Sequence, residues 1–129
     1  AMFHPDLSIY TKQHDLLREL AMKSDCVIVG RCADYVLKDL NPIRIFAYAD
    51  MPSKIKRCME RRPEGESLNE AQMKKSIEKI DRSRAKYYSF FSGQKWGARE
   101  NYDLLINTSG ADINALSSAF CRYIDTSAE

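Results

Sequence analysis

The sequence predicts an α/β domain with a short parallel sheet of about three strands. Three short apolar runs, at residues 26–29, 43–49 and 104–106, are separated by segments whose apolar residues repeat at helical spacing. This alternation of strands and helices is typical of parallel sheets. The 129 residues suit one domain, taken as residues 2–129 because Ala1 ahead of Met2 is typical of a cloning remnant.

The first half of the chain predicts two strands and the helices around them. Leu16, Leu17 and Leu20 lie on one face of an amphipathic helix over residues 8–23. Residues 26–29 are continuously apolar and end at Gly30, as a strand buried on both faces does. A short helical segment over residues 33–37 then leads to the second strand, 43–49.

The second half predicts three helices and the last strand. A helix over residues 53–62 is followed by Pro63, and Ser67 and Glu70 match a capping box at the start of a long helix that ends near Gly93. The strand 104–106 and a closing helix over 113–124 complete the chain. One stripe of the long helix is predicted to be buried, and it comprises Met73, Ile77, Ile80, Arg84, Tyr88 and Phe91.

Composition and charge restrict the possible partners. Residues 54–86 carry 11 basic and 6 acidic side chains in a chain of net charge +2, which indicates either an anionic partner or a solvated helix face. A nucleic acid is disfavoured because no aromatic residue interrupts the basic stripe formed by Lys75, Lys79, Arg82 and Lys86. No apolar run is long enough for a membrane span or a secretory signal, so we expect a cytoplasmic protein without membrane contact.

The four cysteines are expected to be reduced and buried rather than disulfide-bonded or metal-binding. Each lies in an apolar pattern, no two have C-x-x-C spacing, and both histidines are distant in sequence. We therefore predict no metal site.

Two places in the sequence are candidate anion sites. Gly30 and Arg31 follow a predicted strand, where a guanidinium offers a planar fork to phosphate, although such an arginine also suits a surface ion pair. Arg84 lies on the predicted buried stripe and needs a partner. Asp81 at i−3 supplies one, either as a purely structural pair or as a pair that faces a cleft and holds an anionic ligand.

Several segments together resemble the latter part of the cytidylate kinase-like family of P-loop proteins. They are residues 26–37 (CVIVGRCADYVL), 43–46 (IRIF), 57–62 (RCMERR), 86–88 (KYY), 93–97 (GQKWG) and 101–109 (NYDLLINTS). The resemblance implies a three-layer P-loop-kinase-like unit with a lid-like helical region over residues 63–97. We expect this unit to lack the family's N-terminal strand and phosphate loop, because the phosphate-loop motif G-x-x-x-x-G-K-[ST] is absent from the sequence.

The resemblance also implies roles for individual residues. Gly30, Arg31, Asp81 and Arg84 would bind the acceptor nucleotide, although Cys32 stands where the family has an aspartate. Arg57 and Arg61 would act as lid residues in catalysis, and Asn107, Thr108 and Ser109 would lie beside the adenine of the donor. The cofactors of the intact family are ATP and magnesium, and neither is expected to bind tightly to a chain without the phosphate loop.

Three hypotheses follow. The first is a cytidylate kinase-like transferase that lacks its ATP phosphate site, is inactive alone, and binds a nucleoside monophosphate or another phosphate anion. The second is a non-catalytic nucleotide-binding or dimerisation module, and the third is a nucleic-acid-binding module. We further expect the strand 26–29 to close up beside 43–49 and the remaining apolar edge to be covered in a homodimer.

Overall fold

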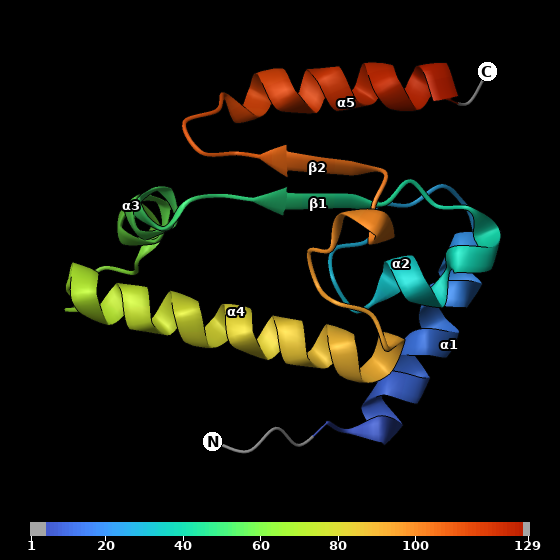
Figure 1. The fold of residues 1–129 in the computed structure, drawn as a ribbon, viewed down its shortest axis with the longest axis horizontal. Coiled ribbons are helices and arrows are strands. Elements are labelled where there is room, and N and C mark those ends of the chain that lie inside the picture. The colour runs from blue at the N-terminus through green and yellow to red at the C-terminus, as the bar shows by residue number, and fades with distance from the viewer. Residues whose placement is uncertain (1–4, 128–129) are drawn as a thin grey trace.

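The computed structural model describes residues 5–127, so the expectations for residues 1–4 and 128–129 lie outside the described residues. Helices surround two short strands, and Figure 1 shows β1 between β2 on one side and α1, α2 and α4 on the other. The elements are α1 (Leu7–Lys23), α2 (Ala33–Val36), the 3₁₀ helix η1 (Lys38–Leu40), β1 (Ile45–Tyr48), α3 (Met51–Arg61), α4 (Glu70–Ser92), the 3₁₀ helix η2 (Arg99–Asn101), β2 (Leu104–Asn107) and α5 (Ile113–Ser127). The α/β class and the alternation of helices with strands are confirmed.

The sheet consists of β1 and β2, which run parallel with Ile45 opposite Leu104 and Tyr48 opposite Asn107. A contact just ahead of both strands supports this register. The backbone N–H of Arg44 donates to Asp103 Oδ2 at 2.7 Å, and the guanidinium lies 3.2 Å from Asp103 Oδ1. These interactions with Arg44 lower the pKa of Asp103, so the carboxylate stays charged.

The prediction of a strand at residues 26–29 was wrong, and the sheet has two strands instead of about three. Val27 is 92% exposed and Val29 is 88% exposed, and the segment has not closed up beside β1. A strand exists only through hydrogen bonds to a neighbouring strand. Among residues 5–127 nothing pairs with this segment, so its strand-like composition is not expressed as a strand.

Helix α4 begins two residues later than its sequence signature indicated. The cap is Asn69 rather than Ser67, and Asn69 and Gln72 bond reciprocally at 2.9 Å in each direction. Both pairs have capping-box spacing, and Asn69 is also a favoured N-cap residue. The helix ends at Gly93, whose φ of 69° is the left-handed conformation typical of a helix C-terminus.

The core is divided into small clusters. Ala33, Val36 and Leu37 are buried against α1, where Tyr10 and Leu17 contact them. A second cluster is aromatic: Phe46 of β1 lies 5.1 Å from Trp96 and 5.0 Å from Tyr102, measured between ring centroids. None of the described side chains is fully buried.

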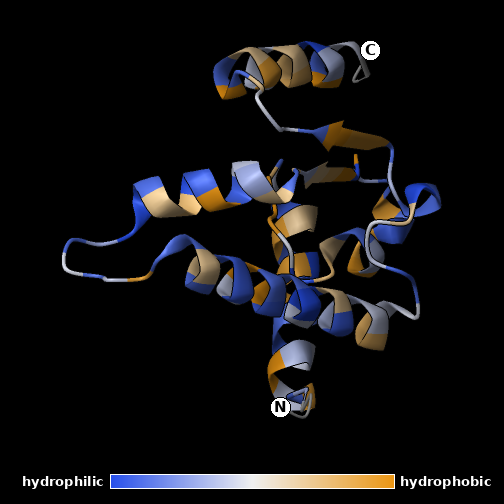
Figure 2. Ribbon diagram, turned by 60° about the vertical axis from the view of Figure 1, so that its left-hand side comes forward, coloured by the Kyte–Doolittle hydropathy of each residue, from blue (hydrophilic) through white to orange (hydrophobic). Residues whose placement is uncertain are grey.

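Helix α5 lies beside β2 (Figure 1), and several of its apolar side chains are exposed. Ile113 is 52% exposed and Ile124 is 42% exposed, and Figure 2 shows hydrophobic and hydrophilic residues mixed along the helix. Within residues 5–127 none of the helices combines the length and hydrophobicity that crossing a bilayer requires.

Candidate functional site

The loop after β2 is fastened to the end of β1. Thr108 donates to the Tyr48 carbonyl from its backbone N–H at 2.7 Å and from its hydroxyl at 2.9 Å. Ser109 Oγ accepts the Asp50 N–H at 2.7 Å, and Asn107 Oδ1 accepts the Ser109 N–H at 3.0 Å. The side-chain oxygens of Asn107, Thr108 and Ser109, expected beside a donor adenine, are therefore already engaged in holding this loop.

Arg57 joins α3 to the same loop. Its guanidinium donates to Thr108 Oγ1 at 2.9 Å and to the Thr108 carbonyl. Arg61, one turn later, is exposed and forms no ion pair or hydrogen bond within residues 5–127. The structure thus gives Arg57 a structural contact that the sequence did not indicate, and the lid role of both arginines stays a prediction.

A cluster of three charged residues joins α3 to α4. Lys54 Nζ donates to Asp81 Oδ2 at 2.7 Å, and Arg84 NH1 lies 3.6 Å from Asp81 Oδ1. The Asp81 side chain is 24% exposed, whereas the Arg84 side chain is 66% exposed. Lys54 provides the close charged hydrogen bond that the partly buried carboxylate needs. The Arg84 guanidinium has five N–H donors, so it keeps donors free for a ligand.

The expectation that Arg84 lies in a buried stripe was wrong. Met73, Ile77 and Tyr88 are buried on α4, but Ile80 is 48% exposed and Arg84 points into solvent. The residues are helical as the spacing predicted, but the middle of this stripe, at Ile80 and Arg84, is not buried. Lys54 was missed because only the packing of α3 on α4 brings it to Asp81.

The segment between residues 26–29 and α2 makes an unusual turn. Gly30, Arg31 and Cys32 have φ angles of 70°, 61° and 59°, so three successive residues are left-handed. This conformation costs a non-glycine residue about 1–2 kcal/mol, and two such residues occur here. The turn directs Cys32 inward, where burial, followed by the charge of Asp34, raises the pKa of its thiol to about 12.

Arg31 lies on the outside of this turn. It is exposed and forms no ion pair within the described residues, yet its charge opposes the burial that raises the pKa of Tyr87. Tyr87 is three residues beyond Arg84 on α4, so the turn places Arg31 toward the same part of the helix. The structure shows no direct contact of Arg31 with Asp81 or Arg84.

A partly buried hydrogen bond holds α2 against α4 and thereby positions this turn. The Tyr88 hydroxyl donates to Asp34 Oδ2 at 2.7 Å and lies 2.9 Å from Gln94 Oε1. Burial, followed by the bond to Asp34, raises the pKa of Tyr88. The sequence signalled this tyrosine only as a core residue, because its partner is 54 residues away.

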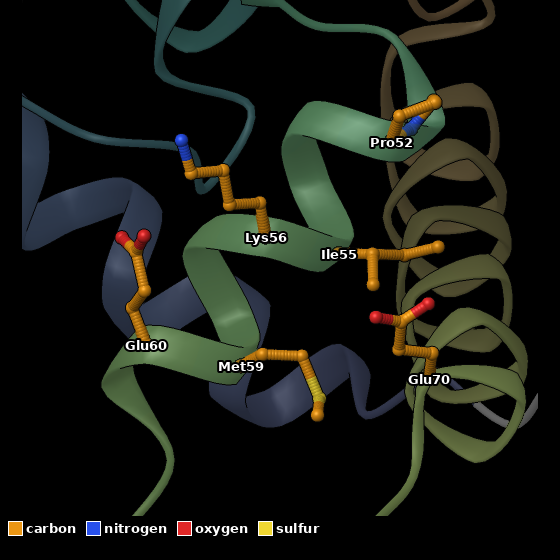
Figure 3. Close-up of a pocket in the computed structure, with 6 residues that line it drawn as sticks. All are labelled: Pro52, Ile55, Lys56, Met59, Glu60 and Glu70. Atoms are coloured by element: carbon orange, nitrogen blue, oxygen red, sulfur yellow. The ribbon is translucent and has the colours of Figure 1, made fainter.

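Two open grooves flank α3. One of about 330 Å³ lies where α3 meets the loop after β2, and its lining residues are Ser53, Lys56, Arg57, Glu60, Gly110 and Ala111. The other, of about 510 Å³, lies between α3 and the start of α4. Figure 3 shows Ile55 and Met59 directed toward Glu70, with Lys56 and Glu60 on the other side of α3. Its two glutamates make the larger groove a poor anion site.

Within residues 5–127 no three His, Cys, Asp or Glu side chains are grouped so that they could bind a metal ion. The four cysteines are free, but the expectation that all are buried was wrong. Cys26 and Cys121 are exposed, Cys58 is half-buried and only Cys32 is buried. Cys26 is open because its predicted strand did not form.

Comparison with known proteins identifies the family. The model of the cytidylate kinase-like family matches residues 3–110. The chain belongs to the cytidylate kinase-like family. This cytidylate kinase-like chain also matches the crystal structure of an uncharacterised protein from Eubacterium ventriosum, with a TM-score of 0.83 and 35% sequence identity. The match covers 96% of this chain and 69% of that one. No curated protein matches it.

Proposed function

We propose that this chain is the acceptor-nucleotide and lid part of a nucleoside monophosphate kinase-like protein. In this proposal it binds CMP or a related phosphate anion and transfers no phosphoryl group by itself. The main observation behind this proposal is the Lys54–Asp81–Arg84 cluster. In it the Asp81 carboxylate pairs with Lys54 and also lies beside the exposed guanidinium of Arg84. A guanidinium so placed forms charge-assisted, often bidentate, bonds to phosphate.

Two further features support an acceptor site on this side of α4. Arg31 adds a second exposed guanidinium from a strained turn, and strained backbone often accompanies ligand sites. Asp81 is partly buried beside Lys54, where its carboxylate is fixed in position to accept a hydrogen bond from an amino group of the ligand. Together they suit a ligand with a phosphate and a base.

ATP and magnesium fit less well with the residues present. The carboxyl end of β1 and β2 has its polar side chains engaged with one another, and neither a glycine-rich phosphate loop nor a metal-ligand cluster is found within the described part of the chain. Phosphoryl transfer depends on such groups to position the donor and stabilise its charge. We therefore assign no catalytic step to this chain.

The direct test is calorimetric titration with CMP, using Arg82→Ala as the matched control. Arg82 and Arg84 lie on the same helix, their side chains are 64% and 66% exposed, and each lies within 4.0 Å of one carboxylate. Losing a charged hydrogen bond to phosphate costs about 1.5–3 kcal/mol, so Arg84→Ala should weaken CMP binding about 10- to 150-fold. Arg82→Ala should bind as the unmodified chain does.

Equal affinities of the two variants, or no heat with CMP, dCMP, UMP or inorganic phosphate, would refute the acceptor site. A coupled assay with saturating ATP and magnesium tests the second half of the proposal. Turnover near the roughly 1–100 per second of kinases would show that the chain is a complete enzyme.

The alternative is a non-catalytic nucleotide-binding or dimerisation module. It shares the acceptor site but takes assembly as the main role of the chain. Light scattering tests the homodimer that it requires, which the sequence also led us to expect, against a monomer of 14.8 kDa. The homodimer and the cytoplasmic location both stay predictions.

A further inference from the structure

The turn that carries Arg31 is fastened to the C-terminal part of α4 at two points. Asp34 Oδ2 accepts a hydrogen bond of 2.7 Å from the Tyr88 hydroxyl. Earlier in the same turn, the Cys32 thiol interacts with the hydroxyl of Ser92, the last residue of α4. Figure 1 shows α2, which begins at this turn, beside that end of α4.

The side chains of α4 that hold the turn are buried. Tyr88 is 5% exposed and Ser92 is 8% exposed. The Ser92 hydroxyl is itself fixed, because it donates to the Tyr88 carbonyl and accepts the Gln94 N–H at 3.0 Å. The fastening therefore belongs to a well-packed part of the chain, whereas Arg31 is exposed.

The turn needs this fastening because its backbone is strained. Gly30, Arg31 and Cys32 are all left-handed, which is unfavourable for a residue that carries a Cβ. One backbone hydrogen bond closes the turn, from the Ala33 N–H to the Gly30 carbonyl at 3.2 Å, but it does not fix the turn relative to α4. A strained conformation persists only where its surroundings hold it, so the contacts with α4 are what maintain it.

The fastening point also lies close to Arg84. Tyr88 and Arg84 are four residues apart on α4, so they lie on one side of the helix about 6 Å apart along its axis. An exposed arginine of a turn that is held at Tyr88 is therefore near the guanidinium of Arg84. Two such guanidiniums suit the several oxygens of one phosphate group.

We propose that Tyr88 is a positioning residue of the acceptor site. Its bond to Asp34 holds the left-handed turn, and the turn directs the Arg31 guanidinium toward the ligand that Arg84 binds. This inference rests on the acceptor site proposed above and adds a residue that touches no ligand itself. Without the bond, the backbone relaxes and carries Arg31 out of its binding position.

Calorimetric titration of Tyr88→Phe with CMP tests the proposal, and Tyr87→Phe is the matched control. Both changes remove one phenolic hydroxyl from α4, but the Tyr87 hydroxyl is buried and has no hydrogen-bond partner within residues 5–127. The apparent Kd rises as the fraction of chains in the binding conformation falls. A hydrogen bond to a charged group shifts a local equilibrium about tenfold or more, so Tyr88→Phe should raise the Kd about tenfold. Tyr87→Phe should leave it unchanged, and equal losses in the two variants would overturn the proposal.

A double-mutant cycle separates positioning from a general structural role. If Tyr88 acts through Arg31, Tyr88→Phe should change the Kd for CMP less than about twofold in an Arg31→Ala chain and still about tenfold in an Arg84→Ala chain. An equal effect in both backgrounds would overturn the proposal, because a merely structural tyrosine weakens binding whichever arginine is present. If circular dichroism shows that Tyr88→Phe does not fold, Asp34→Ala removes the same bond and enters the same cycle.

Thiol labelling at pH 8 measures release of the turn without any nucleotide. Cys32 lies in the turn and is buried, so Tyr88→Phe should speed its labelling in the folded chain about tenfold or more relative to Tyr87→Phe. Mass spectrometry identifies the labelled cysteine. Unchanged labelling would overturn this proposal even if CMP binds. Absence of CMP binding by the unmodified chain would instead refute the acceptor site and the positioning role with it, while the labelling would still show whether Tyr88 holds the turn.

Discussion

Gly97 should be one of the positions least tolerant of a side chain, because it touches the sheet. Its φ is +82°, and a Cβ built on it lies 3.2 Å from Phe46 Cζ, tighter than ordinary van der Waals contact. Gly93 is the matched control, with a φ of +69° and nothing within 4 Å of its added Cβ. Alanine at either position pays about 1–2 kcal/mol for the left-handed conformation.

Only Gly97→Ala also displaces the Phe46 ring, which is held between Trp96 and Tyr102. Overpacking of this kind costs about 1–3 kcal/mol more, so its total loss of unfolding free energy should be about 2–5 kcal/mol. Urea unfolding of both variants measures the difference at constant m-value. Adding Phe46→Leu to Gly97→Ala should remove most of the extra cost.

Equal losses of unfolding free energy in the two glycine variants would refute this reasoning, because they would mean that the Phe46 ring moves aside at no cost. The same conclusion would follow if Phe46→Leu failed to reduce the penalty in the double variant.

Two further predictions concern titratable groups. Burial raises the pKa of the Cys32 thiol to about 12. At pH 8 a thiol reagent should therefore label the exposed Cys26 and Cys121 quickly and Cys32 only when the chain unfolds. Rapid labelling of Cys32 in the folded chain would contradict its buried position. The hydrogen bonds from Arg18, at 2.7 and 2.9 Å, lower the pKa of Asp39 to about 2, below an unfolded value of about 3.9. The Arg18–Asp39 pair therefore stabilises the folded chain fully above about pH 4, and this stabilisation is lost as the pH falls toward 2. The difference in Tm between the unmodified chain and Asp39→Asn should shrink over that window. A difference that stays constant would argue against the pair.

Local patterns located most helices and the sheet-forming strands. The boundaries of α1 and α3 follow from apolar spacing and from Pro63, because both reflect interactions within one or two turns. The cap of α4 shows the limit of this approach. The sequence signature pointed to Ser67 with Glu70, whereas the structure caps the helix with Asn69 and Gln72, two residues later.

For the candidate site, the sequence singled out the individual residues but did not reveal their surroundings. Arg84 was singled out because its spacing placed it on a stripe that was wrongly expected to be buried, and Asp81 because it lies three residues earlier on the same helix. Lys54 and the bond from Arg57 to Thr108 were not, since these partners are 27 and 51 residues apart and meet only through packing.

The sequence by itself determined the family, the α/β class and the helical segments, because motifs and periodicity are carried by residues close together in the chain. Tertiary structure alone decided that residues 26–29 are not a strand, that Arg84 is exposed and that Cys26 is open to solvent. These three outcomes share one physical reason. Burial and strand pairing require a neighbour, and apolar character in a sequence shows the need for that neighbour without supplying it.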